Sequence, residues 1–280
     1  MIIDFHTHTF PEKIAPATIK KLEGAAHIRA CVDGTQKDLL TSMDRAGIDL
    51  SVVLPVATSA RQVTKVNDVS AALNGRGNIL YFGCIHPDLE DWEQELKRIA
   101  DLGLKGVKLH PVYQGVDIDD KRYLRILDKC AQLGLIVVTH AGEDIGFPDR
   151  ENCVPSMIRR AVKAVGPVKL VAAHMGGWRC WDEALDFLAD TDVCIDTSFS
   201  LGRLNSLGDG YYTDTQQKLL DPERFCAIVR SFGSHRVLFG TDSPWGGQTE
   251  HLADFNALPL TETEKERILG RNAAQLLGLL

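Results

Sequence analysis

The sequence has no run of lysine and arginine, no apolar stretch near the length of a membrane span and no Cys-x-x-Cys pair. With a formal net charge of -7 the chain repels phosphate backbones, so we expect no nucleic-acid partner. A bilayer span needs roughly 20 apolar residues, so we expect no membrane association. The start, MIIDFHTH, lacks the basic and apolar regions of a signal peptide. These absences predict a cytoplasmic protein.

The cysteine content argues against a disulfide framework. The chain has 7 cysteines, an odd number, which we interpret as free thiols in a reducing compartment. Hydrophobic residues make up 44% of the chain and charged residues 25%, close to the globular average, which argues against disorder. At 280 residues the chain suits one α/β barrel, so we expect a single domain over residues 1–280.

Short apolar runs alternate with longer amphipathic segments. Such runs are typical of parallel strands buried on both faces. We expect strands at Met1–Phe5, Asp49–Val56, Ile79–Ile85, Gly106–His110, Leu135–His140, Lys169–His174, Val193–Thr197 and Arg236–Gly240. We expect helices at Asp91–Leu102, Arg122–Leu133 and Thr261–Leu277, and long loops at Gly142–Cys153 and Ser198–Asp214. An open doubly wound sheet would bring a glycine-rich loop after an early strand, whereas His-Thr-His stands there, so we predict a (β/α)8 TIM barrel.

Metal-ligand residues stand directly after several of these strands. His6 and His8 are two residues apart at the end of the first strand, so both imidazoles point to one face. His140, His174 and Asp242 end three later strands. The strand ends of a barrel meet at one rim, and imidazole and carboxylate groups suit zinc and similar ions. The pattern predicts a metal site there.

Other polar residues near the strand ends are candidates for substrate binding: His110, Lys108, Trp178 and Arg179. An inward Lys108 has three readings that the sequence leaves open: a carboxylated bridge between two metals, a partner for a substrate carboxylate, or a charge that neutralises Asp242. Asp196 either orients a histidine or caps backbone amides.

The chain resembles the amidohydrolase superfamily, in its amidohydrolase-related (amidohydrolase 2) branch. The resemblance rests on DFHTH, GVKLHP, VVTHAG, AAHMGG, FGTDSPW and ILGRNAAQLLGL, which span nearly the whole chain in the expected order. It implies a distorted barrel, with His6, His8, His140 and Asp242 as metal ligands and His174 as the histidine of the sixth strand. Members of this branch usually hold one metal, whereas the bridging lysine of binuclear relatives leaves the role of Lys108 open.

We therefore expect an enzyme, and first a hydrolase of an amide, ester or lactone in a small molecule. One divalent ion, zinc or else manganese, would activate a water, with Asp242 as general base and His174 as oxyanion stabiliser. The first alternative is a non-oxidative decarboxylase, a lyase, acting on an aromatic or enol acid. The second is a metal-stabilised binding protein without turnover. The sequence leaves the oligomeric state open, with a homodimer as the commonest assembly.

Overall fold

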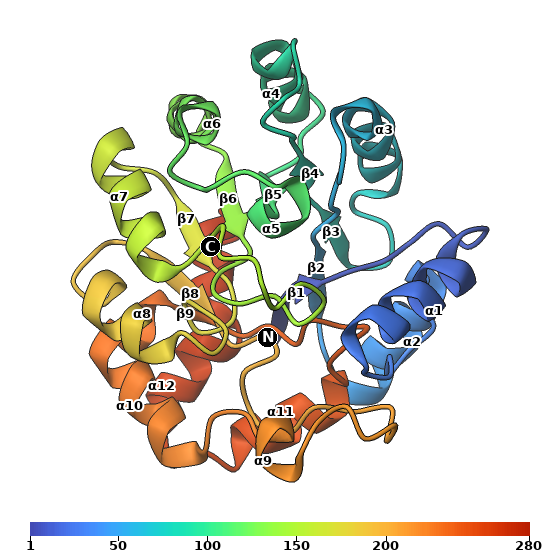
Figure 1. Cartoon of the computed structure of the whole chain (residues 1–280), viewed down its shortest axis with the longest axis vertical. Coiled ribbons are helices and arrows are strands. Elements are labelled where there is room, and N and C mark those ends of the chain that lie inside the picture. The colour runs from blue at the N-terminus through green and yellow to red at the C-terminus, as the bar shows by residue number, and fades with distance from the viewer. The chain divides into compact units, whose positions relative to one another are not determined.

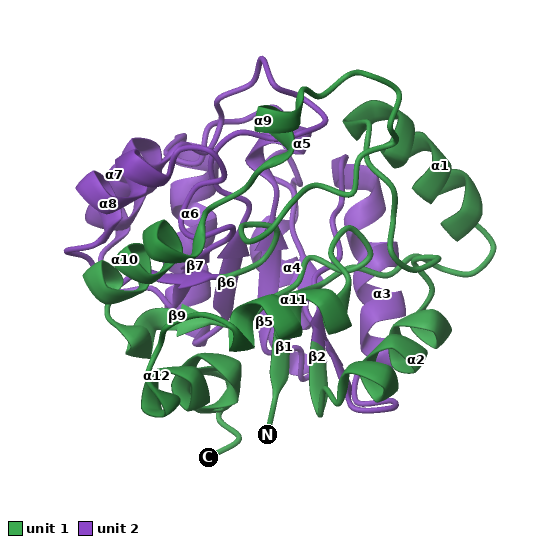
Figure 2. Cartoon of the chain, turned by 90° about the horizontal axis from the view of Figure 1, so that it is seen from below, with its two compact units in different colours: residues 1–51, 197–280 green, residues 52–196 purple.

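The computed structural model describes all residues from Met1 to Leu280 and divides into two compact units. The first unit comprises Met1–Ser51 and Thr197–Leu280, and the second comprises Val52–Asp196 (green and purple in Figure 2). Strand β2 (Leu50–Val53) contains the point at which the chain passes from one to the other. None of the helices has the length and apolar character that crossing a membrane requires.

The second unit alternates parallel strands with helices. Its strands are β3 (Ile79–Tyr81), β4 (Gly83–Cys84), β5 (Gly106–Leu109), β6 (Ile136–Thr139), β7 (Leu170–Ala172) and β8 (Cys194–Asp196). Its helices are α3 (Val63–Leu73), α4 (Trp92–Asp101), α5 (Pro111–Gln114), α6 (Lys121–Leu133), α7 (Pro155–Val165) and α8 (Trp181–Leu188). Strands β4 to β8 pair in sequence order and in parallel, with Val107 opposite Val137. Every residue of β5, β6 and β7 is buried, and Figure 1 shows α4, α6 and α7 outside these strands.

The first unit holds strands β1 (Ile3–Thr7) and β9 (Val237–Leu238). Its α-helices are α1 (Ala15–Ala26), α2 (Gln36–Ala46), α9 (Asp214–Gln217), α10 (Pro222–Phe232), α11 (Gln248–Asn256), α12 (Glu262–Glu266) and α13 (Asn272–Leu277). The Phe5 N–H donates to the Phe239 carbonyl over 2.8 Å, and Thr7 forms a parallel bridge with Ser243. These bonds place the segments after β1 and β9 side by side.

The predicted strand and helix alternation is confirmed, with two local differences. The third predicted strand is interrupted at Phe82, whose N–H donates to the Val53 carbonyl, so it appears as β3 and β4. The predicted helix at Thr261–Leu277 begins with the expected capping box of Thr261 and Glu264. Its middle turn is π-helical, over Arg267–Arg271, and joins α12 to α13. Hydrophobic periodicity cannot show such a turn, because inserting one residue changes the hydrogen-bond pattern and not the composition.

Candidate metal centre

Three metal-ligand side chains of the first unit meet where β1 and β9 end. The Nε2 atoms of His6 and His8 are 3.2 Å apart. The Asp242 Oδ1 lies 3.4 Å from the His6 Nε2 and 3.1 Å from the His8 Nε2. His6 and Asp242 are buried and His8 is half-buried, so the three groups form a largely enclosed cluster.

The geometry of this cluster suits a divalent ion. An ion that lies about 2.0–2.2 Å from each ligand atom in tetrahedral geometry holds those atoms roughly 3.3–3.6 Å apart. The observed separations, 3.1 to 3.4 Å, are close to that range. Two imidazole nitrogens and one carboxylate oxygen are also a donor set that zinc and manganese accept. The three residues therefore fit a bound cation.

Further contacts within the first unit hold these ligands in place. The Ser198 Oγ lies 3.1 Å from the His6 Nδ1, so it fixes the ring and leaves the Nε2 for an ion. The Asp242 N–H donates to the His6 carbonyl over 2.8 Å. Asp242 has a φ of 63°, in the left-handed region that few residues other than glycine adopt. Backbone strain of this kind is concentrated at functional sites, since the surrounding contacts must offset its cost.

Asp4 connects the two segments that carry the ligands. Its carboxylate accepts hydrogen bonds from the Thr241 N–H (3.0 Å), the Thr241 hydroxyl (2.6 Å) and the Gln248 amide (2.8 Å). A longer bond of 3.3 Å comes from the His6 N–H. Burial raises the pKa of Asp4 to about 6, although these hydrogen bonds lower it. Asp4 thereby links the strand of His6 to the residue before Asp242.

The second unit brings together a cluster of its own residues after β5 and β6. The rings of His110 and His140 are stacked, with centroids 4.4 Å apart and planes inclined by 10°. The Asp144 Oδ2 lies 3.6 Å from the His110 Nε2 and 3.8 Å from the His140 Nε2. These three side chains are buried, and their ligand-type atoms are close enough to hold a metal ion.

His174, after β7, lies against this cluster. Its ring centroid is 5.0 Å from that of His140. His174 has a φ of 59°, and its N–H donates to the Asp196 Oδ1 over 3.0 Å. The Asp196 carboxylate thus accepts a backbone amide, one of the two roles that the sequence left open. This bond stabilises the left-handed turn that sets the direction of the His174 side chain.

The candidates for substrate binding also lie in the second unit. Lys108, on β5, is 2% exposed and therefore buried. The guanidinium of Arg179 lies 4.6 Å from the ring centroid of Trp178, a cation–π contact. Two aromatic residues that we did not predict extend the histidine stack: the Tyr113 ring lies 3.7 Å from that of His110, and Phe147 packs edge-on against Tyr113.

Within each unit, the structure brings predicted site residues close together. His6, His8 and Asp242 meet in the first unit, whereas His140 lies with His110 and His174 in the second. The assignment of His140 as a fourth ligand of the same ion stays a prediction. Sequence reasoning missed Asp4, Asp144 and Ser198. Asp144 carried a signal, because it stands four residues after His140 in the long loop predicted at Gly142–Cys153.

A profile of the amidohydrolase family (Amidohydro_2) matches residues 3–279. A curated relative, 2-amino-3-carboxymuconate-6-semialdehyde decarboxylase of Dictyostelium discoideum, is 29% identical over 214 residues. The match covers 66% of this chain and 57% of the relative, so it spans little more than half of that protein's length.

Solved structures show the same fold. A TIM-barrel protein from Bordetella bronchiseptica has a TM-score of 0.74 at 19% identity and covers 99% of this chain and 98% of its own. The 5-carboxyvanillate decarboxylase of Sphingomonas paucimobilis has a TM-score of 0.68 at 15% identity, over 99% and 98% of the chains. A dihydroxybenzoic acid decarboxylase of Polaromonas, solved with manganese bound, has a TM-score of 0.71 at 16% identity, over 99% and 97%. The predicted (β/α)8 barrel is confirmed.

The expectation of a hydrolase is wrong. The relative from Dictyostelium is a decarboxylase, and decarboxylases recur among the similar structures. The error has a chemical reason: one ion held by histidines and an aspartate supports both reactions, since it polarises a substrate oxygen in either case. The motif residues therefore identify a site and not a reaction. With the profile covering nearly every residue, the chain belongs to the amidohydrolase family.

Proposed function

We propose that this protein is a metal-dependent, non-oxidative decarboxylase of a small aromatic or enol carboxylic acid. The observation that carries the proposal is the 29% identity to a decarboxylase. The cluster of His6, His8 and Asp242 supports it, because it supplies the donor set that a divalent ion needs. A bound ion would polarise the substrate carboxylate and a neighbouring oxygen.

The chain's own residues would bind the acid and move one proton. Decarboxylation breaks the bond between the ring carbon and the carboxylate, leaves the electron pair on that carbon and requires a proton there. We assign this proton transfer to Asp242 or His174, the two residues that the sequence marks as catalytic. Arg179 is cationic and packs on Trp178, so it suits the acid group. His110 and Lys108 complete the proposed binding residues.

The histidine and tyrosine rings of the second unit favour a planar substrate. His140, His110 and Tyr113 are stacked in one series, with centroid separations of 4.4 and 3.7 Å. Stacked rings offer flat apolar faces, and aromatic pairs gain roughly 0.5–1.5 kcal/mol beyond the burial of their area. A flat aromatic or enol acid would use such a surface better than a flexible aliphatic one.

Product analysis tests the reaction. We expect a panel of hydroxylated aromatic acids to include a substrate that releases carbon dioxide in stoichiometric amount. In D₂O the product should carry one deuterium at the carbon that lost the carboxylate, and in H₂¹⁸O the organic product should gain no ¹⁸O. Incorporation of ¹⁸O into the organic product, without release of carbon dioxide, would contradict decarboxylation.

We also propose that residues 1–280 form one catalytic domain, located in the cytoplasm, that binds one zinc or manganese ion per chain. Elemental analysis should find close to one equivalent. His8→Ala should weaken metal affinity by roughly 100-fold or more, because it removes a ligand and not merely an orienting contact. His27→Ala is the matched control, since His27 pairs with Asp209 on the surface.

Elemental analysis and metal affinity also test how many ions each chain binds and whether His140 is a fourth ligand. Two equivalents per chain would indicate that Lys108 bridges a second ion. A loss of metal in His140→Ala as large as that in His8→Ala would support His140 as a ligand, and unchanged affinity would remove it. Unchanged affinity in His8→Ala would contradict the metal centre itself.

A further inference from the structure

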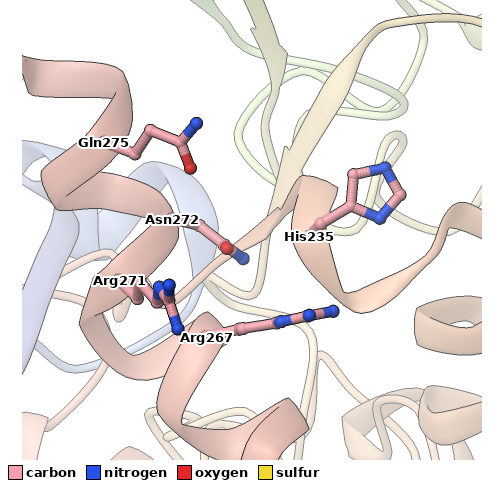
Figure 3. A pocket seen from close by; sticks show the side chains of 5 residues that line it. All are labelled: His235, Arg267, Arg271, Asn272 and Gln275. Atoms are coloured by element: carbon pink, nitrogen blue, oxygen red, sulfur yellow. The ribbon is translucent and has the colours of Figure 1, made fainter.

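A polar groove lies in the first unit, at the other end of β9 from Asp242. It has a volume of about 300 Å³ and is lined by His235, Arg267, Arg271, Asn272 and Gln275 (Figure 3). His235 stands in the short turn before β9, whereas Asp242 comes after that strand. The groove is therefore distinct from the cluster of His6, His8 and Asp242, and none of its residues has a role in the proposed reaction.

The π-helical turn builds one wall of this groove. An α-helix turns about 100° per residue, so the residue five places after Arg267 would lie about 140° around the axis. In the structure the Asn272 N–H donates to the Arg267 carbonyl, which is the i→i+5 bond of a π-turn. This wider turn brings Arg267, Arg271 and Asn272 to one face. Single π-turns within helices occur frequently at functional sites.

The opposite wall is fixed by Asn272 and by a glycine. The Asn272 amide donates to the carbonyls of Ser234 and Val237, at 2.7 Å each, and so ties the helix to the turn that carries His235. Gly233 has a φ of 81°, and a Cβ there would lie 2.7 Å from the Cε1 of the His235 ring. The ring thus packs where only glycine leaves room. Figure 3 shows His235 on a different segment from the helix that carries both arginines.

The groove concentrates positive charge on an acidic protein. The side chains of Arg267 and Arg271 form no ion pair or hydrogen bond within the chain, although the chain has a net charge of -7. The nearby Glu264 is engaged in the helix cap with Thr261, and its hydrogen bonds there lower its pKa, with smaller contributions from the charges of Arg230 and Arg267. The two guanidinium groups lie beside the His235 imidazole. Each guanidinium offers several N–H donors and has no hydrogen-bond acceptor.

We propose that this groove binds the phosphoryl group of a small phosphorylated molecule. Guanidinium groups bind phosphate through paired, charge-assisted hydrogen bonds, and two of them match a dianion. The volume, about 300 Å³, is at the lower end of small-ligand pockets and accommodates a phosphate with a short substituent. The π-turn is hydrogen-bonded to the residue that follows β9, because the Phe239 N–H donates to the Ile268 carbonyl over 2.9 Å. A ligand here would contact the segment that supports β9.

Calorimetric titration of the metal-loaded, full-length protein with inorganic phosphate, at low ionic strength, tests the proposal. We expect a phosphate site in the wild-type protein that becomes at least roughly ten-fold weaker in the double variant Arg267→Gln/Arg271→Gln. Arg45→Gln is the matched control, because Arg45 is an exposed helix arginine of the same unit. It should bind phosphate as the wild type does. Phosphate that binds at the metal would bind equally in all three proteins, so the comparison distinguishes it from phosphate bound in the groove.

Two further variants control for the loss of charge and for unfolding. Arg267→Lys/Arg271→Lys keeps both charges and loses the planar donors, so its affinity should fall between those of the wild type and the glutamine variant. Circular dichroism and the melting temperature without phosphate verify the fold, and Arg271→Lys alone serves if a double variant unfolds. Equal phosphate affinity in wild type and Arg267→Gln/Arg271→Gln would overturn the site. Tighter binding of malonate than of phosphate would overturn the choice of a phosphoryl group.

Discussion

Asp242→Asn should lower the rate of carbon dioxide release by about 10²–10⁴-fold, the usual contribution of a positioned acid or base. The Asp242 Oδ1 lies 3.1 Å from the His8 Nε2, within the cluster that we propose to hold the ion. An amide has nearly the shape of the carboxylate, yet it carries no charge and cannot pass on a proton. The rate is measured on the acid identified by product analysis, with the metal content determined in parallel.

Asp44→Asn is the control for this variant. Asp44 is exposed on α2 in the same unit, so the same chemical change should leave the rate within about two-fold of the wild type. An unchanged melting temperature would show that Asp242→Asn leaves the fold intact. If Asp242→Asn retains its activity while His174→Asn loses it, proton transfer belongs to His174 and Asp242 leaves the catalytic role.

Asp4→Asn should lower the free energy of unfolding by about 3 kcal/mol, because it removes the acceptor of a buried network. The Thr241 N–H, the Thr241 hydroxyl and the Gln248 amide all donate to this carboxylate. An asparagine NH₂ group would face at least one of these donors and leave it without an acceptor. The cost of ionising buried Asp4, whose pKa burial raises to about 6, offsets part of the loss at neutral pH. Urea unfolding at pH 7.5 measures the difference.

The same variant should also weaken metal binding, since Asp4 connects the strand of His6 to the segment of Asp242. Asp49→Asn is the matched control: Asp49 accepts the Ile2 N–H over 2.6 Å, but it is exposed to solvent. We expect less than about 1 kcal/mol of destabilisation there and no change in metal affinity. A loss of 0.5 kcal/mol or less in Asp4→Asn would show that the network contributes little to the fold.

The reaction was not predictable from the strand-end residues, because they led to the expectation of a hydrolase, which is wrong. His6, His8 and Asp242 carry a signal because a polar residue that ends an apolar strand is costly unless it binds something. That signal concerns the ion and not the bond that breaks. Loop segments, such as the one after β6 that carries Phe147, have no periodicity from which a substrate could be inferred.

Local sequence patterns determined the barrel and most of its elements. Buried parallel strands require apolar runs, and helix ends require caps such as Thr261 with Glu264. Both features are therefore visible in the amino-acid sequence alone. The tertiary structure alone decided that Asp4 accepts hydrogen bonds from Thr241 and Gln248, and that Asn272 aligns with Arg267 and Arg271. Contacts between residues more than 200 positions apart, and a single widened helical turn, depend on how the chain packs. No local pattern records that packing.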